Sequence, residues 1–222
     1  MSVLELVILT KSAKRGGFCV AGIDLKTRDW VRLVSENEEN DGAITNGQMR
    51  DVDGSFVKPL DVVRVNVKAH APIGCQSENY IVFSNRPWIR IGRMTFEQVL
   101  SICSTIRSKY IFGNQYKYLN EERVSEFTRS LMLVEVSEFK IYKNEFDKIK
   151  CSFKYGGYHY SDISMTDPDY YGYDNCDLGA VHIVVSLPHT DFEGRYYKFV
   201  AKIFPRGPIP PKQNPLSDLL NF

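Results

Sequence analysis

Three cations and two glycines lie within one short segment near the amino terminus, KSAKRGG at residues 11–17. Glycines let the backbone approach a phosphate closely, and successive amide groups in such a turn form a nest for an anion. The segment is not a P-loop, because the pattern G-x-x-x-x-G-K-[ST] is absent. Lys11, Lys14 and Arg15 are therefore candidate contacts for a phosphate backbone. The alternative is an ordinary strand connection with solvated lysines.

A second basic group combines four cations with a tryptophan. Residues 61–68 alternate, with valines on one face and Arg64 and Lys68 on the other. Further along, Trp88 and Arg90 share a face of a short segment, and Arg93 follows. Guanidinium groups beside a large aromatic surface are typical of a groove that binds a single strand. The alternative places Trp88 in the core and pairs the arginines with carboxylates.

Tyrosines are concentrated between residues 155 and 173. Tyr158 and Tyr160 are two residues apart, so they lie on one face of a strand. Such rings either stack on bases or fill a barrel. Both are kept as candidate nucleic-acid contacts, although filling is the commoner role.

The sequence gives little support for a metal site or for catalysis. Cys151, His159, Cys176 and His182 fall in one region, but their spacing matches no zinc pattern. An E-x-K pattern at residue 138 precedes the P-D pair at residue 168, the reverse of the order in restriction-type nucleases. We therefore expect no metal, no cofactor and no catalysis. A carboxylate pocket around Asp167, for sensing or processing a nucleotide, remains a weaker possibility.

The elements that position these residues are mostly strands. Apolar or alternating runs at residues 4–10, 18–23, 30–34, 61–68, 80–83 and 88–91 predict a first group of strands. A second group follows at 131–136, 139–142, 149–154, 181–187 and 196–203. Two glycines at 156–157 predict a hairpin turn, because both can adopt positive φ.

Helical signals are confined to the middle of the chain. Thr95 and Gln98 form a capping box before an apolar stripe, and a second helix is expected after Asn120. Strands, helices and strands in this order predict two small β-barrels joined by a helical segment. The expected boundaries are 1–92 for the first barrel with an acidic loop at 35–57, 93–130 for the connector, 131–205 for the second barrel, and 206–222 for a proline-rich tail.

Composition and charge restrict the class of protein. The 222 residues are 43% hydrophobic and 25% charged, which excludes a wholly disordered chain. The net charge of +1 hides an uneven distribution: +3 over residues 1–34, −5 over 35–57, +6 over 58–117 and −3 over 118–222. A basic first half interrupted by an acidic loop favours a polyanionic partner. No apolar run is long enough to span a membrane, no secretory signal is visible, and five unclustered cysteines suggest reduced thiols in a cytoplasm.

Several phrases in their order resemble a known family. They are KSAKRGGFCVAG at residue 11, WVRLV at 30, PLDVV at 59, QSENY at 76, TDP at 166, VSLP at 185 and YKFVAKI at 197. The chain resembles the dual OB-containing (DuOB) family, which is found mainly in prokaryotes. This resemblance implies two OB-type barrels and a role in binding nucleic acid, and it carries over no catalytic motif.

The sequence thus predicts a mainly β, cytoplasmic protein that binds nucleic acid with two OB-like antiparallel barrels. Single-stranded DNA or RNA is favoured, because no recognition-helix motif is present. The second hypothesis is a protein-interaction adaptor, with a partner bound through the carboxyl-terminal Leu219, Leu220 and Phe222. No membrane association is expected.

Overall fold

The computed structural model describes residues 2–103 and 105–212. The chain divides into two compact units, one formed by residues 1–104 with 128–130 and the other by 105–127 with 131–222. The segment 93–130, expected to be a helical connector, is thus divided between the two units. Within the described residues, no helix is long and apolar enough to cross a membrane.

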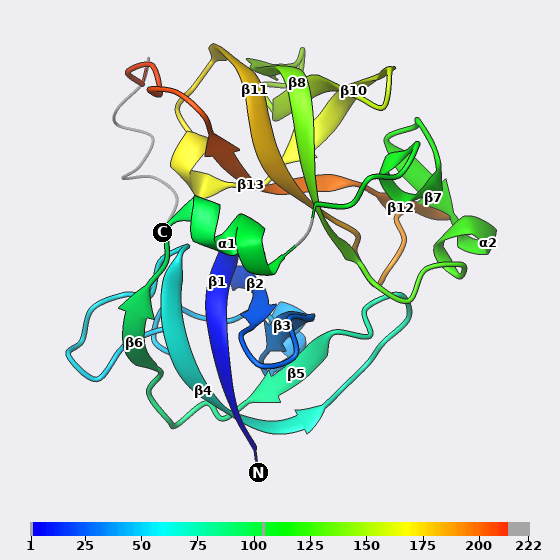
Figure 1. Ribbon diagram of the computed structural model, residues 1–222. Helices are drawn as coiled ribbons and strands as arrows, with labels where there is room; N and C mark the ends of the chain where they lie inside the picture. Colours follow the sequence, from blue (N-terminus) through cyan, green and yellow to red (C-terminus); the bar gives the residue numbers. More distant parts are fainter. Residues whose placement is uncertain (1, 104, 213–222) are drawn as a thin grey trace. The chain divides into compact units, whose positions relative to one another are not determined.

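The first unit is a β-barrel with one added strand (Figure 1). Strands pair in the order β1-β2-β3-β5-β4, and β4 pairs back with β1, which closes the ring; β6 then extends the sheet beyond β4. Every pairing in this ring is antiparallel except that of β3 with β5. The elements are β1 (Ser2–Lys14), β2 (Gly17–Asp24), β3 (Trp30–Val34), η1 (Glu38–Asn40), β4 (Asp61–His70), β5 (Asn79–Val82), β6 (Ile89–Arg93) and α1 (Phe96–Ile102).

Alternation along β4 produces the core of this unit. Val63, Val65 and Val67 are fully buried in the main cluster, whereas Arg64 is exposed on the opposite face. The acidic segment 35–57 contributes three apolar residues to the same cluster, Ile44, Met49 and Val57. This segment is therefore fixed to the barrel by apolar burial rather than lying loose in solvent.

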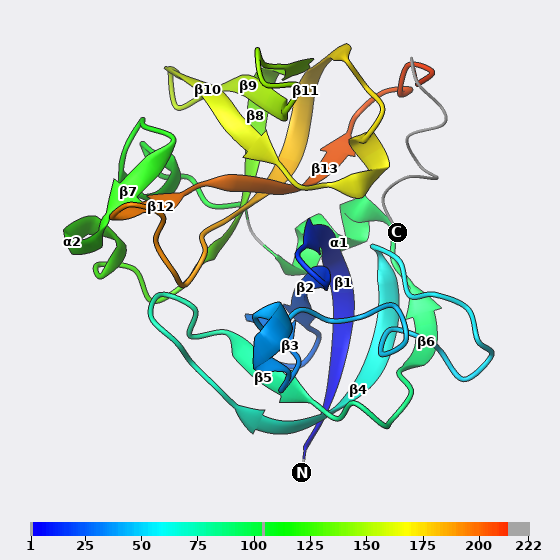
Figure 2. The same cartoon turned by 180° about the vertical axis from the view of Figure 1, so that it is seen from behind.

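The second unit is a closed barrel of five strands in the order β10-β13-β11-β8-β9. Figure 2 shows its β9–β10 hairpin from the side opposite to Figure 1. A small sheet of β7 and β12 accompanies the barrel. The elements are η2 (Ile111–Gly113), β7 (Tyr118–Asn120), α2 (Glu121–Val124), β8 (Leu131–Lys143), β9 (Ile149–Tyr155), β10 (Tyr158–Met165), η3 (Pro168–Tyr170), β11 (Asn175–Ser186), β12 (Arg195–Tyr197) and β13 (Phe199–Pro205).

The two barrels share one connectivity. In each ring the first strand pairs with the second and the fourth, and the third strand closes the ring by a parallel pairing with the fifth. In the second unit these strands are β8, β9, β10, β11 and β13. Two barrels of five mainly antiparallel strands confirm the predicted fold class.

Local signals in the sequence also have their structural counterparts. The capping box of Thr95 and Gln98 begins α1, and Asn120 caps the single turn of α2. The hairpin between β9 and β10 turns at Gly156 and Gly157, both with positive φ. A Cβ atom at Gly156 would lie 2.4 Å from the carbonyl oxygen of Lys109, so this turn also requires glycine for close packing.

Candidate nucleic-acid interface

The amino-terminal basic segment is a strand with a tight turn rather than a glycine-flanked loop. Lys11 to Lys14 belong to β1, and only Arg15 and Gly16 form the turn to β2. Gly16 has a φ of 77°, which suits this two-residue connection. The side chain of Arg15 is exposed, whereas Lys14 forms an ion pair with Asp41, at 2.8 Å.

The acidic segment 35–57 neutralises three of the cations that the sequence singled out. Besides the pair of Lys14 with Asp41, Lys68 pairs with Glu36, and Arg90 lies 3.1 Å from Asp53. These cations come from three different strands or strand ends of the first unit. The basic surface predicted for this half of the chain is therefore largely compensated within the unit itself.

The two remaining arginines of the second basic group are also paired. Arg64 donates to Glu5, its register partner on β1, at 2.6 Å, and Arg93 donates to the buried carboxylate of Asp61, at 2.7 Å. An exposed pair such as that of Arg64 with Glu5 contributes little to stability, about 0–1 kcal/mol. A phosphate can therefore compete for such a cation at small energetic cost.

Trp88 is a core residue. Only 1% of its surface is exposed, and it belongs to the main hydrophobic cluster of the first unit. It presents no face on which a base could stack, so its expected role in a groove is corrected to one in packing. Arg90 of β6 turns instead toward Asp51 and Asp53.

An aromatic and cationic cluster does lie beside the β1–β2 hairpin. The ammonium group of Lys11 lies 4.5 Å from the ring centre of Phe18 and 5.5 Å from that of Phe56, and the guanidinium of Arg50 covers Phe56 at 4.9 Å. Phe56 is 39% exposed. The sequence pattern indicated Lys11 but neither Arg50 nor Phe56, because these two lie in an irregular segment without periodicity.

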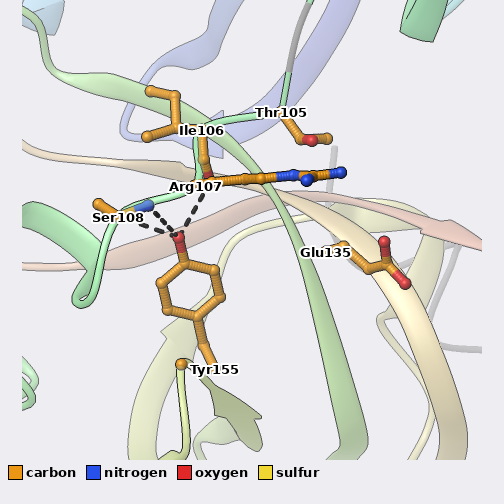
Figure 3. Close-up of a pocket in the computed structure, with 7 residues that line it drawn as sticks. Thr105, Ile106, Arg107, Ser108, Glu135 and Tyr155 are labelled. Atoms are coloured by element: carbon orange, nitrogen blue, oxygen red, sulfur yellow. Dashed lines mark hydrogen bonds between the residues drawn. The ribbon is translucent and has the colours of Figure 1, made fainter.

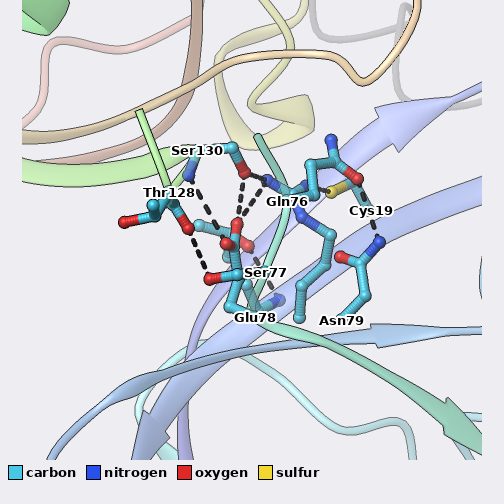
Figure 4. Close-up of polar contacts among 10 residues, drawn as sticks. Cys19, Gln76, Ser77, Glu78, Asn79, Thr128 and Ser130 are labelled. Atoms are coloured by element: carbon cyan, nitrogen blue, oxygen red, sulfur yellow. Dashed lines mark hydrogen bonds and ion pairs between the residues drawn. The ribbon is translucent and has the colours of Figure 1, made fainter. Parts of the chain in front are cut away.

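The phrases that carry the family resemblance meet in a buried polar network in the first unit (Figure 4). Arg32 of β3 donates to Cys19 of β2, to Ser130 at 2.6 Å and to Glu78 at 3.4 Å. Ser130 in turn donates to Glu78, and the neighbouring Asn79 donates to Gln76 at 3.2 Å. Burial opposes the charge of Arg32, yet Cys19 and Glu78 beside it raise its pKa. The network thus stabilises the parallel closure of β3 against β5.

A second aromatic and cationic cluster lies at the β9–β10 hairpin of the second unit. The rings of Tyr110 and Tyr158 lie 4.7 Å apart, and their hydroxyl groups are hydrogen-bonded at 3.2 Å. Lys109 lies over both rings, 5.1 Å and 5.8 Å from their centres. Hydrogen bonds from Tyr110 and Lys109 lower the pKa of Tyr158. Because both rings are only half-buried, this cluster keeps aromatic surface and positive charge at the surface.

Tyr160 has a different role from Tyr158. It is 1% exposed, stacks on Phe153 inside the barrel, and its hydroxyl group accepts from the amide of Ile111 and donates to the carbonyl of Asn114. Burial raises the pKa of Tyr160 to about 12. The expectation that it contacts bases is therefore corrected: it fills the barrel and fixes the segment before β7.

A cavity of about 320 Å³ adjoins the cluster of Lys109, Tyr110 and Tyr158 (Figure 3). The hydroxyl group of Tyr155 accepts from the amide of Ser108 at 3.1 Å and donates to the carbonyl of Ile106 at 3.0 Å, which fixes one wall. Arg107 and Glu135 line the cavity with charged groups of opposite sign. Arg206 donates to Glu135 at 2.6 Å.

Asp167 does not line this cavity. It is buried, accepts from the amide of Ile203 at 3.0 Å and pairs with Lys202 at 3.1 Å. Burial lowers the pKa of Lys202, but the carboxylates of Asp167 and Asp169 outweigh this effect and raise it. The T-D-P phrase therefore serves to attach η3 to β13, and the expected nucleotide pocket around Asp167 is corrected.

Comparison with known families agrees with this architecture. A profile of the dual OB-containing domain matches residues 4–203, which is most of the chain. The chain belongs to the dual OB-containing domain family. No curated protein and no solved structure matches this family member significantly.

The remaining candidates in this dual OB protein are its thiols and its possible metal ligands. None of the five cysteines, all of which lie in the described part of the chain, forms a disulfide, and burial raises the pKa of Cys151 and Cys103, the latter to about 11. In the part of the chain that the structure describes, no group of three or more His, Cys, Asp or Glu side chains is placed to hold a metal ion.

Proposed function

We propose that this protein binds single-stranded nucleic acid with its OB-type barrels and performs no catalysis of its own. The observation that carries this proposal is the exposed cluster of Lys109, Tyr110 and Tyr158 at the end of β9 and β10. These are the second and third strands of their ring, and OB barrels bind oligonucleotides on the face of those strands. Aromatic rings stack on bases while a cation contacts the backbone. We expect this function in the cytoplasm.

The cluster at the β1–β2 hairpin supports the same function in the first unit. Lys11 and Arg50 cover the rings of Phe18 and Phe56, and Arg15 is exposed at the adjacent turn. The loop between the first two strands is a usual contact of OB barrels with oligonucleotides. Each unit thus offers at least one surface that combines rings with cations.

Binding to a panel of single- and double-stranded DNA and RNA at two salt concentrations tests the proposal. We expect single strands to bind best and the affinity to fall steeply with salt. Tyr158→Ala should remove stacking surface at a cost of about 1–3 kcal/mol, with little change in the salt slope. Lys109→Ala should flatten the slope by about one unit.

Tyr116→Ala is the matched control, because this exposed tyrosine of the same unit has no described cation over its ring. It should leave both affinity and slope unchanged. Absence of binding to every nucleic acid at low salt would refute the proposed function. Equal losses of affinity in Tyr158→Ala and in Tyr116→Ala would show that the cluster is not part of the binding site.

A protein-interaction adaptor is the second candidate, and one observation favours it. Ile89 and Ile91 are exposed on β6, which is bonded along one side to β4. An apolar interface of this kind would bind a partner with little dependence on salt, in contrast to phosphate contacts. Leu219, Leu220 and Phe222, expected to mediate this role, lie outside the described residues.

A further inference from the structure

The cavity beside the tyrosine cluster carries charges of both signs. Arg107 and Glu135 of β8 both line it (Figure 3). Arg107 has no ion-pair partner among residues 2–103 and 105–212. Arg206 donates to Oε1 of Glu135, and Nε2 of His182 lies 3.9 Å from Oε2. The pocket therefore offers donors from Arg107 on one side and an acceptor from Glu135 on another. It suits a neutral, flat group that has acceptors on one edge and donors on another.

Guanine is the base that fits this arrangement of charges. Its O6 and N7 atoms accept from an arginine fork, and its 2-amino group donates to an acceptor. Adenine presents an amino donor where guanine has O6, so it cannot accept two hydrogen bonds from the same arginine. Glu135 would accept from the donors on the pairing edge of guanine, which is free in a single strand.

The cavity and the tyrosine cluster are continuous along the chain. Ser108 lines the cavity and is followed directly by Lys109 and Tyr110. On the hairpin, Tyr155 and Gly156 line the cavity two to three residues before Tyr158. A strand that places one base in the cavity therefore has an aromatic surface and a cation for the adjoining nucleotide.

We propose that this cavity binds a guanine base of a single-stranded nucleic acid, with Arg107 donating to O6 and N7 and Glu135 accepting from the amino edge. This inference rests on the proposed function and adds a base preference to it. The neighbouring nucleotide stacks on Tyr158 and Tyr110.

The test measures the affinity of ten-nucleotide thymine oligonucleotides by fluorescence anisotropy at low salt. Each oligonucleotide carries a single central guanine, adenine or hypoxanthine. The guanine oligonucleotide should bind about tenfold more tightly than the adenine one. Hypoxanthine lacks only the 2-amino group, so it should fall between the two. Equal affinity for all three oligonucleotides would overturn the guanine site while leaving the proposed function in place.

Two variants assign the contacts to their residues. Arg107→Lys keeps the charge but loses the planar fork, so it should abolish the preference for guanine over adenine. Glu135→Gln should reduce the difference between guanine and hypoxanthine. Arg123→Lys, an exposed arginine on α2, is the matched control and should keep the wild-type preference. Melting curves of each variant separate lost contacts from lost folding, and an unchanged preference in a folded Arg107→Lys variant would refute the assignment.

A mononucleotide arm distinguishes the cavity from strand binding. Guanosine, adenosine and inosine monophosphates are titrated against the full chain by NMR, with the amides of residues 105–108 and 156 as reporters. Guanosine monophosphate should shift these amides at the lowest concentration, even if no oligonucleotide binds. Absence of any preference among the three nucleotides would refute the guanine site independently of the proposed function.

Discussion

Lys198 places an amine inside the second unit with no described carboxylate beside it. It is 1% exposed, and its ammonium group donates to the carbonyl and the side-chain oxygen of Asn114, both at 2.8 Å. Burial lowers the pKa of Lys198 from 10.5 to about 7. Below about pH 7 the folded state must bury a charge, and between pH 7 and 10.5 it holds fewer protons than the unfolded state. The free energy of unfolding should therefore rise with pH across this window.

Replacing this amine tests the effect. Lys198→Met should raise the free energy of unfolding at pH 7 by about 1–3 kcal/mol and remove most of its rise toward pH 10. The two oxygens of Asn114 keep other donors, Tyr160 and the amide of Tyr116, so the variant leaves neither unsatisfied. Urea unfolding at several pH values measures this, with the exposed Lys148→Met as control. Parallel pH profiles for wild type and Lys198→Met would contradict the argument.

Trp88 offers a second test at the level of one residue. Because it is buried in the main cluster, Trp88→Ala should cost about 3–5 kcal/mol of stability. The fraction that remains folded should bind oligonucleotides as wild type does. Thermal melting together with anisotropy checks this, and a folded variant with weakened binding would return Trp88 to the site.

Residue types alone could not separate Tyr158 from Tyr160 or Trp88 from a surface ring. Alternation correctly predicted the buried valines of β4 and the interior face of β9. Alternation predicts which face of a strand a side chain lies on. It does not predict which end of the barrel is covered by another segment of the chain. Tyr160 is covered by residues 111–114, whereas Tyr158 at the hairpin is left half-exposed. Such coverage depends on contacts nearly fifty residues apart.

At the scale of elements, the acidic segment 35–57 decides how much of the basic surface is available. Its apolar residues fix it to the core, and its carboxylates then pair with cations of three strands or strand ends. Asp51 also accepts from the backbone amide of Arg90, at 3.1 Å, and so covers part of the outer edge of β6. Covering an edge in this way limits unwanted pairing with other chains.

Neutralising the segment should strengthen nucleic-acid binding. A variant with Glu36→Gln, Asp41→Asn and Asp53→Asn removes the carboxylate partners of Lys14 and Lys68 and leaves Arg90 with Asp51 alone. We expect tighter binding to single-stranded oligonucleotides at low salt, and a salt slope steeper by up to about three units. Anisotropy titrations over a range of salt concentrations measure both quantities.

A control must separate local pairing from net charge. Glu121→Gln, Glu122→Gln and Glu145→Gln remove the same number of charges from the second unit. If this triple variant strengthens binding as much as the first, then overall charge rather than release of the paired cations is responsible. If neither variant changes the slope, the cations of the first unit do not contact phosphate.

At the scale of the whole molecule, the sequence predicted two barrels but not their common connectivity. Strand patterns mark where a strand lies, whereas ring closure depends on the pairing of the third with the fifth strand. That pairing involves three residue pairs in the first unit and two in the second. So short a parallel pairing leaves no pattern in the sequence. The side chains that stabilise it, Arg32 with Glu78 and Asp167 with Lys202, became recognisable only through their contacts.

The boundary between the units carries the last prediction. Residues 128–130 belong to the first unit although residues 105–127 before them belong to the second. Ser130 connects them to the closure of the first barrel, because its hydroxyl group accepts from Arg32 and donates to Glu78.

Ser130→Ala removes a hydrogen-bond partner from both Arg32 and Glu78, which are buried, and should lower the free energy of unfolding by about 1–3 kcal/mol. Hydrogen exchange should then accelerate in β3 and β5 but not in β9 and β10, and substitution of the exposed Ser161 of β10, Ser161→Ala, should leave β3 and β5 unchanged. Uniform acceleration in both units would show instead that the barrels unfold as one cooperative body.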